Sequence, residues 1–189
     1  TEISSIIGLA QGHKYIGKFK EARLLANGAI KQAREFGDAE LIAKSLICSG
    51  DIFLSATFQS HEAERDYMDA RKITTRLGDA PLLAEALCGM ARVYHQMGDN
   101  ARTLQYARNA FEIARDAGER YWLGNALSII GMATARHQPE KAMQAIEDAI
   151  MIARQDNFPL LELDLTGQLG QLLSRQKRYA DEGQLMLEK

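Results

Sequence analysis

Apolar side chains recur along the chain at the three-and-four spacing that is typical of amphipathic helices. In residues 80–97 they fall on one helical face, at Leu83, Leu87, Met90 and Tyr94. Stretches of the same kind alternate with short segments of residues that favour turns. The pattern predicts five pairs of helices: 2–16 with 19–36, 39–56 with 60–77, 80–97 with 100–117, 120–137 with 139–156, and 159–176 with 179–189.

Small residues mark the register of these helices. Two small residues 28 positions apart recur with a period of about 40 residues. The pairs are Ala22 with Gly50, Ala63 with Ala91, Thr103 with Gly131, and Ala142 with Gly170. Two helices approach to about 8 Å only where their side chains are short, so we expect helices to touch at these positions and Gly131→Leu to destabilise the fold. The period indicates a single tandem array over residues 1–189, with repeats at about 2–36, 39–77, 80–117, 120–156 and 159–189, the last one incomplete.

The composition fits a helical array and argues against several other classes of protein. Apolar residues make up 46% of the 189 residues, and only 3 are Pro, of which Pro81 and Pro159 fall at predicted helix starts. A net charge of −2 gives no general attraction for nucleic acid or an anionic membrane, and the apolar runs are too short to span a bilayer. The two cysteines, Cys48 and Cys88, lack metal-ligand spacing and fit a reducing, cytoplasmic compartment. Because the chain starts at Thr1 and stops within a repeat, we expect it to be a piece of a larger protein.

Two segments resemble the second half of a tetratricopeptide repeat: GDNARTLQYARNAFEIA at residues 98–114 and GKFKEARLLANGAIKQA at residues 17–33. A third segment, LAEALCGMARVY at residues 83–94, resembles the first half of the repeat. The period of about 40 residues exceeds the family's usual value and resembles the longer-helix type found in bacterial signalling and regulatory proteins. The resemblance implies an all-α fold, a right-handed α–α superhelix (solenoid) of about five helix-turn-helix repeats whose first helices line the concave side.

The resemblance also implies that a partner binds on the concave side, where we place a stripe of mostly polar residues. Within the first helices these residues are spaced i, i+3, i+7, or i, i+7 in the last one, so each set shares one helix face. Such a stripe suits an extended peptide held by side-chain hydrogen bonds to its backbone. The alternative is a solvated face that binds nothing. The predicted groove residues are Lys44, Ile47, Asp51, Glu85, Cys88, Arg92, Asn125, Ser128, Met132, Asp164 and Gln171.

The sequence offers little for catalysis. His61 and Glu62 begin like a metalloprotease helix, but Arg65 stands where the second histidine is needed. No phosphate-cradling glycine loop and no nucleophile elbow occurs, so we expect no enzymatic activity, no metal and no cofactor. Of the remaining aromatic residues, we expect Trp122 to make a core contact between repeats and Tyr106 to be exposed.

The leading hypothesis is a protein- or peptide-binding module. In a larger bacterial signalling protein it would be the sensory or regulatory part, joined to a transcription-regulator or nucleotide-cyclase type of output, with no direct contact to nucleic acid or membrane. A second hypothesis is a self-association scaffold that forms a homodimer through apolar residues of the last repeat. A third is a regulatory domain that binds a small effector. The residues considered for self-association are Leu163, Leu165, Leu169 and Leu172.

Overall fold

The computed structural model describes residues 2–56 and 59–187, including their side chains except those of residues 176 and 178–187. Within this part of the chain every regular element is an α-helix. The helices are α1 (Glu2–Tyr15), α2 (Phe19–Phe36), α3 (Ala39–Ser55), α4 (Ser60–Leu77), α5 (Ala80–Gln96), α6 (Asn100–Ala117), α7 (Arg120–Thr134), α8 (Pro139–Gln155) and α9 (Pro159–Leu187).

The turns between successive hairpins follow from glycine and aspartate in the sequence. Three even-numbered helices end at a glycine in the left-handed conformation, which side chains disfavour. The glycines are Gly37 (φ 71°), Gly78 (φ 69°) and Gly118 (φ 75°). After two of them an aspartate caps the next helix: Asp38 accepts a hydrogen bond from the Leu41 amide, and Asp79 from the Leu82 amide, each at 3.0 Å.

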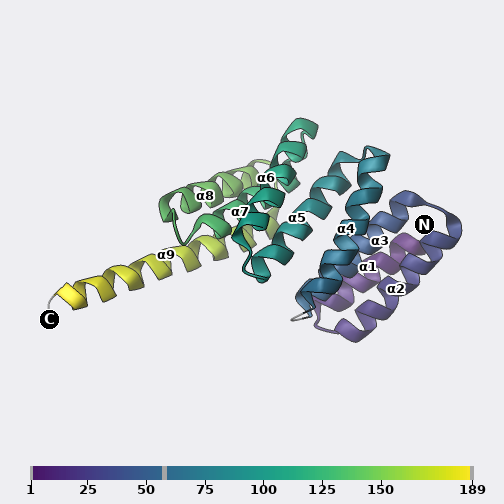
Figure 1. The fold of residues 1–189 in the computed structure, drawn as a ribbon, viewed down its shortest axis with the longest axis horizontal. Coiled ribbons are helices and arrows are strands. Elements are labelled where there is room, and N and C mark those ends of the chain that lie inside the picture. Colours follow the sequence, from purple (N-terminus) through teal and green to yellow (C-terminus); the bar gives the residue numbers. More distant parts are fainter. Residues whose placement is uncertain (1, 57–58, 188–189) are drawn as a thin grey trace.

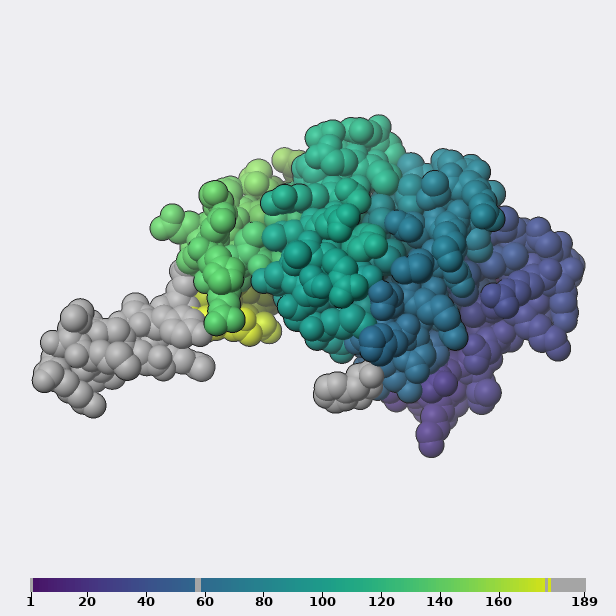
Figure 2. Space-filling view, in the orientation of Figure 1, coloured from purple at the N-terminus to yellow at the C-terminus, as the bar shows by residue number. Residues whose placement is uncertain are grey.

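The helices form hairpins that stack in file from α1 to α9 (Figure 1). Each odd-numbered helix packs against the next odd-numbered helix, whereas the even-numbered helices of the described chain make no contact with one another. The odd-numbered helices therefore lie on the inner side of the curve and the even-numbered ones on the outer side. In the space-filling view the colours follow one another along an elongated body without mixing, as in a solenoid (Figure 2). The expected all-α superhelical solenoid is confirmed.

The small-residue register lies where the helices of a hairpin touch. A Cβ atom added at Gly131 would lie 2.8 Å from Ile146 Cγ1 and 2.9 Å from the Ala142 carbonyl oxygen. One added at Gly50 would lie 2.9 Å from the ring of Tyr67. These separations are too short for real carbon atoms, so α3–α4 and α7–α8 approach closely only because both positions are glycine. The expected role of these two glycines is confirmed.

The fifth hairpin was predicted wrongly, because α9 is one helix and not two. The repeat pattern predicts a turn between helices at 159–176 and 179–189, but the helix runs unbroken from Pro159 to Leu187. No glycine or proline occurs between Gly170 and Gly183, so nothing in that stretch ends a helix. As a consequence no second helix packs on Gly170, and a Cβ atom there would meet nothing within 4 Å. Residues 188–189 lie outside the described chain.

Candidate functional site

The predicted groove residues all lie on odd-numbered helices, but the middle member of each triplet is buried. Ile47 is 2% exposed, Cys88 is 1% exposed and Ser128 is 5% exposed. Since neighbouring odd-numbered helices pack side by side, the residue at the i+3 position faces the adjacent helix and not the groove. These three residues are therefore unavailable to a partner in this structure, whereas the outer members of each triplet are at least partly exposed.

Asp51 joins three hairpins on the concave face. Its Oδ1 atom accepts hydrogen bonds from the Tyr67 hydroxyl at 2.5 Å and from Arg92 Nη2 at 3.2 Å. Its Oδ2 atom lies 3.5 Å from the ammonium of Lys14. These partners come from α4, α5 and α1, so a single carboxylate on α3 connects four helices. Asp51 and Arg92, expected to face a ligand, are joined by one hydrogen bond, while the buried Nε of Arg92 has no hydrogen-bond partner among the described residues.

Glu85 is the carboxylate of this face that has no partner within the described chain. It forms no hydrogen bond or ion pair there, and partial burial raises its pKa to about 7, with Asp51 adding to the rise and Arg92, Lys44 and Lys14 opposing it. Lys44 is instead paired with Glu40, one turn before it, at 2.5 Å. Glu85 is therefore an unpaired carboxylate to which a donor group of a ligand could bind. Arg92, Lys44 and Lys14 lie near enough to act on its pKa.

Two tyrosines that the sequence analysis did not select also belong to this face. Tyr15 is 80% exposed at the end of α1, and Tyr121 is 40% exposed at the start of α7. Burial raises the pKa of Tyr121, a hydrogen bond with Asn125 opposes the rise, and Tyr15 and Glu85 add to it. Tyr15 and Glu85 thus influence Tyr121 electrostatically across the concave face and not through a direct contact. Only the curvature of the array brings residues so far apart in sequence together, so no local sequence signal could identify them.

A cleft opens on the same side between the C-terminal ends of α5 and α7 and the middle of α9. It has a volume of about 180 Å³ and includes two predicted residues, Met132 and Gln171. Gln168, which lines it, is held in place because its Oε1 accepts from the Ser128 hydroxyl at 2.7 Å and its Nε2 donates to Asp164 at 2.9 Å. Apolar and polar groups thus alternate around a small recess. The full lining is His95, Met132, Ala135, Gln168, Gln171, Leu172 and Arg175.

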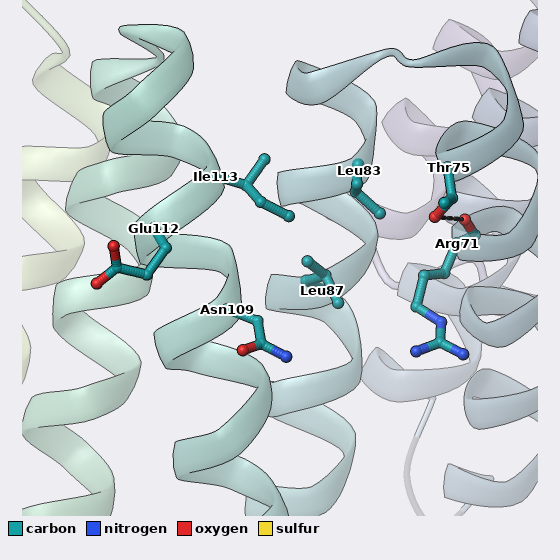
Figure 3. Close-up of a pocket in the computed structure, with 7 residues that line it drawn as sticks. All are labelled: Arg71, Thr75, Leu83, Leu87, Asn109, Glu112 and Ile113. Atoms are coloured by element: carbon teal, nitrogen blue, oxygen red, sulfur yellow. Dashed lines mark hydrogen bonds between the residues drawn. The ribbon is translucent and has the colours of Figure 1, made fainter.

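A second recess lies on the outer side, where α4 and α6 diverge over α5. Figure 3 shows Leu83 and Leu87 of α5 between the residues of α4 and those of α6. The recess has a volume of about 290 Å³. Leu87 is nevertheless buried in the core, at 4% exposed, and Leu83 packs against the same cluster, as their place on the apolar face of the helix predicts. The recess above them comes from the divergence of the even-numbered helices, which cannot be read from the apolar pattern. The other lining residues are Arg71, Thr75, Asn109, Glu112 and Ile113.

The described residues contain neither a metal-binding cluster nor an activated thiol. In the range that the structure covers, no group of three or more His, Cys, Asp or Glu side chains is placed to hold a metal ion. Burial raises the pKa of both Cys48 and Cys88 to about 12, so these thiols are poor nucleophiles. None of the described helices is long and apolar enough to cross a membrane.

The stacked hairpins, with their small-residue contacts and polar inner face, define a tetratricopeptide-like helical-repeat protein. A family model described as Anaphase-promoting complex subunit 5 matches residues 3–50, 53–137 and 125–159, which together span most of the chain. The chain therefore belongs to this family of tetratricopeptide-like repeats. No curated protein sequence matches it.

Two solved structures are similar in fold. One is a Signal Transduction ATPase with Numerous Domains (STAND) protein with a tetratricopeptide repeat sensor, PH0952 from Pyrococcus horikoshii, with a TM-score of 0.70 and 14% identity over 99% of this chain. The chain spans 30% of the length of that protein. The other is BtubC (BKLC) from P. vanneervenii, with a TM-score of 0.69, 17% identity, and coverage of 96% of this chain and 81% of that one. At these identities the likeness concerns the fold.

Proposed function

We propose that the chain is a protein-binding module that holds an extended segment of its partner on the concave face. The observation that carries this proposal is the cleft between α5, α7 and α9, which Met132, Gln171 and Arg175 help to line. An apolar side chain of the partner would enter the recess at Met132, while amides such as Gln171 bind its backbone. Toward the N-terminus, Tyr15, Tyr121 and Glu85 would continue the same track. Tyrosine is among the residues that contribute most to protein interfaces.

A protein segment suits this surface better than a small effector. Pockets for small molecules usually enclose about 300–1,000 Å³ and cover most of the ligand. The concave cleft measures about 180 Å³, which is room for one side chain. A chain of several residues that uses the cleft and the tyrosines together fits the elongated face.

We further propose that the module is a cytoplasmic, sensory part of a larger bacterial signalling protein. The similarity to a protein with a tetratricopeptide repeat sensor, over a part of that longer chain, supports the sensory role within a larger protein. The bacterial setting rests on the resemblance of the period of about 40 residues to the longer-helix type of repeat. Filling the groove would change the curvature of the array, because each hairpin contacts only its neighbours. That change would bias an attached output domain.

Selection of a displayed random-peptide library, followed by fluorescence polarisation, tests the binding surface. We expect Met132→Glu to weaken a selected peptide by tenfold or more, about 1.4 kcal/mol, and Gln171→Ala to weaken it less. Asn109→Arg is the control, since it obstructs the outer recess of Figure 3 and leaves the concave face intact. If selected peptides bind the Met132→Glu variant as tightly as the wild type but no longer bind the Asn109→Arg variant, the binding site lies on the outer face.

A further inference from the structure

One face of the first half of α9 packs against no other helix of the described chain. The opposite face is buried against the preceding hairpin through Leu161, Leu165 and Leu172. On the open face Leu160 is 80% exposed and Leu163 is 71% exposed. In the preceding hairpins the corresponding side of an odd-numbered helix receives the even-numbered helix, but α9 continues away from the body (Figure 1).

The open face combines a ridge and a hollow. Residues 160, 163, 167, 170 and 174 follow three-and-four spacing and so share one side of the helix. The two leucines form the ridge at its start. Further along, Gly167 and Gly170 have nothing within 4 Å of a Cβ position. They line an open hollow of about 480 Å³ together with Gln171, Ser174 and Arg175.

Ridge and hollow are complementary to each other in an antiparallel arrangement. If two copies of α9 face one another in opposite directions, Leu160 and Leu163 of each copy lie opposite the Gly167–Gly170–Ser174 side of the other. A two-fold axis makes this contact twice, which is the usual symmetry of a homodimer. A parallel arrangement would instead place leucines against leucines and glycines against glycines, leaving both hollows empty.

The charges on this helix favour the same arrangement. Asp164 lies toward the start of the face and Arg175 toward its end, on the same flank by helical spacing. Neither forms an ion pair with another described residue; Asp164 only accepts a hydrogen bond from Gln168. When Leu160 of one copy lies opposite Ser174 of the other, Asp164 lies opposite Gly170, five residues or about 7.5 Å along the axis from Arg175. The two opposite charges therefore attract each other across the contact, again twice, without forming a close ion pair. This charge complementarity requires a second copy of the same helix.

We propose that the chain forms a homodimer through antiparallel pairing of the first halves of two α9 helices, with Leu160 and Leu163 of each copy in the glycine-lined hollow of the other. Leu163 was among the residues considered for self-association from the sequence. Leu165 and Leu172 are buried within the chain, so they are not part of this contact. A single helix pair buries less than about 1,200 Å², so the dimer is weak and forms reversibly.

Sedimentation velocity over a range of protein concentrations measures the dimer directly. We expect Leu163→Glu to weaken dimerisation at least tenfold. Leu24→Glu is a matched control, because Leu24 is 74% exposed on α2 and lies outside the face. We expect Gly170→Leu to weaken the dimer as well by filling the hollow, while its circular dichroism stays that of a folded protein, since nothing within the chain obstructs a side chain there.

A charge exchange and a cross-link test the direction of pairing. Asp164→Arg and Arg175→Asp should each weaken the dimer, and the double variant should restore it. In a mixture of Leu160→Cys and Ser174→Cys chains, antiparallel pairing predicts oxidised heterodimers in excess over homodimers; the native thiols are buried and do not interfere.

Three results would overturn the dimer. A wild-type chain that stays monomeric at all concentrations means that another segment or partner covers the face. A dimer that is insensitive to both Leu163→Glu and Gly170→Leu means that the contact lies elsewhere. Homodimeric cross-links in excess mean parallel pairing. The concave variant Met132→Glu should leave dimerisation unchanged, so the dimer and the proposed peptide binding can fail independently.

Discussion

At the scale of single residues, the two carboxylates of the concave face differ in the partners that the described chain provides for them. Asp51 is satisfied by Tyr67, Arg92 and Lys14, and it thereby holds neighbouring hairpins together. Glu85 lies near the same cations but contacts none of them within hydrogen-bonding distance, so its burial is not compensated. The two carboxylates therefore have opposite effects on the free energy of unfolding: Asp51 stabilises the array, whereas Glu85 destabilises it and keeps an unpaired carboxylate on the concave face.

Removing the charge of Glu85 should stabilise the protein at high pH. The pKa of Glu85 is raised from 4.5 to about 7 in the folded chain, so the folded state binds the proton more tightly than the unfolded state. The contribution of this group to the free energy of unfolding is favourable at low pH and is lost as the pH rises from about 4.5 through 7. We expect Glu85→Gln to be more stable than the wild type by about 1–3 kcal/mol at pH 8 and nearly equal at pH 4.5.

Urea denaturation at the two pH values measures this difference. Glu147→Gln, which neutralises an exposed glutamate on the outer helix α8, should show no such dependence on pH. A stability difference that is the same at both pH values would contradict the raised pKa.

Several residue assignments could be predicted from the sequence and others could not. Helical spacing correctly placed the groove residues on the odd-numbered helices, and alignment of the repeats correctly placed Trp122, which packs half-buried against the core cluster of α5–α7. Spacing alone could not separate the inward-facing residues from those that face a neighbouring helix, such as Ile47. Tyr106, expected to be exposed, is half-buried because its ring stacks on Tyr94 with centroids 5.2 Å apart. That contact depends on the packing between α5 and α6.

At the scale of the element, the same glycine register has different consequences in α7 and α9. The bounds of α1–α8 could be predicted to within a few residues, because Gly-Asp turns, prolines and apolar spacing agree. The course of α9 could not, because the repeat pattern suggested a turn where no residue terminates a helix. Gly131 is consequently covered by α8, and Gly170 is not covered.

The same substitution should therefore have opposite effects at these two glycines. Gly131→Leu forces atoms against the Ala142 carbonyl and Ile146, and we expect it to destabilise the chain by about 3 kcal/mol through overpacking. Gly170→Leu meets no obstacle and replaces a helical glycine, so we expect it to stabilise the chain by about 0.5–1 kcal/mol. The melting temperatures of the Gly131→Leu and Gly170→Leu variants, measured at a concentration where the chain is monomeric, test this difference. Equal melting temperatures for both variants would mean that the close approach of α7 and α8 is absent.

At the scale of the whole molecule, stability is distributed along the array. Every described helix packs only on helices that are one or two positions away in the order. No core joins the first hairpin to the last, so a local loss of stability has no direct route to the far end. Contacts that cross between hairpins, such as those made by Asp51, decide how far a perturbation travels. The same contacts would transmit a change of curvature when the groove is filled.

Removal of the Tyr67 hydroxyl group tests how far along the array a local loss of stability spreads. Tyr67 is fully buried between α3 and α5, and its hydroxyl donates to Asp51 at 2.5 Å. Tyr67→Phe keeps the ring and removes this bond, at a cost of about 1–2 kcal/mol. In hydrogen exchange followed by mass spectrometry, we expect faster exchange in α3, α4 and α5 and unchanged exchange in α7 and α8.

Tyr106→Phe is the control, since that hydroxyl forms no hydrogen bond with the described residues. Equal acceleration from α1 to α8 would show that the chain unfolds as one cooperative unit, and the proposed transmission from hairpin to hairpin would then lose its physical basis.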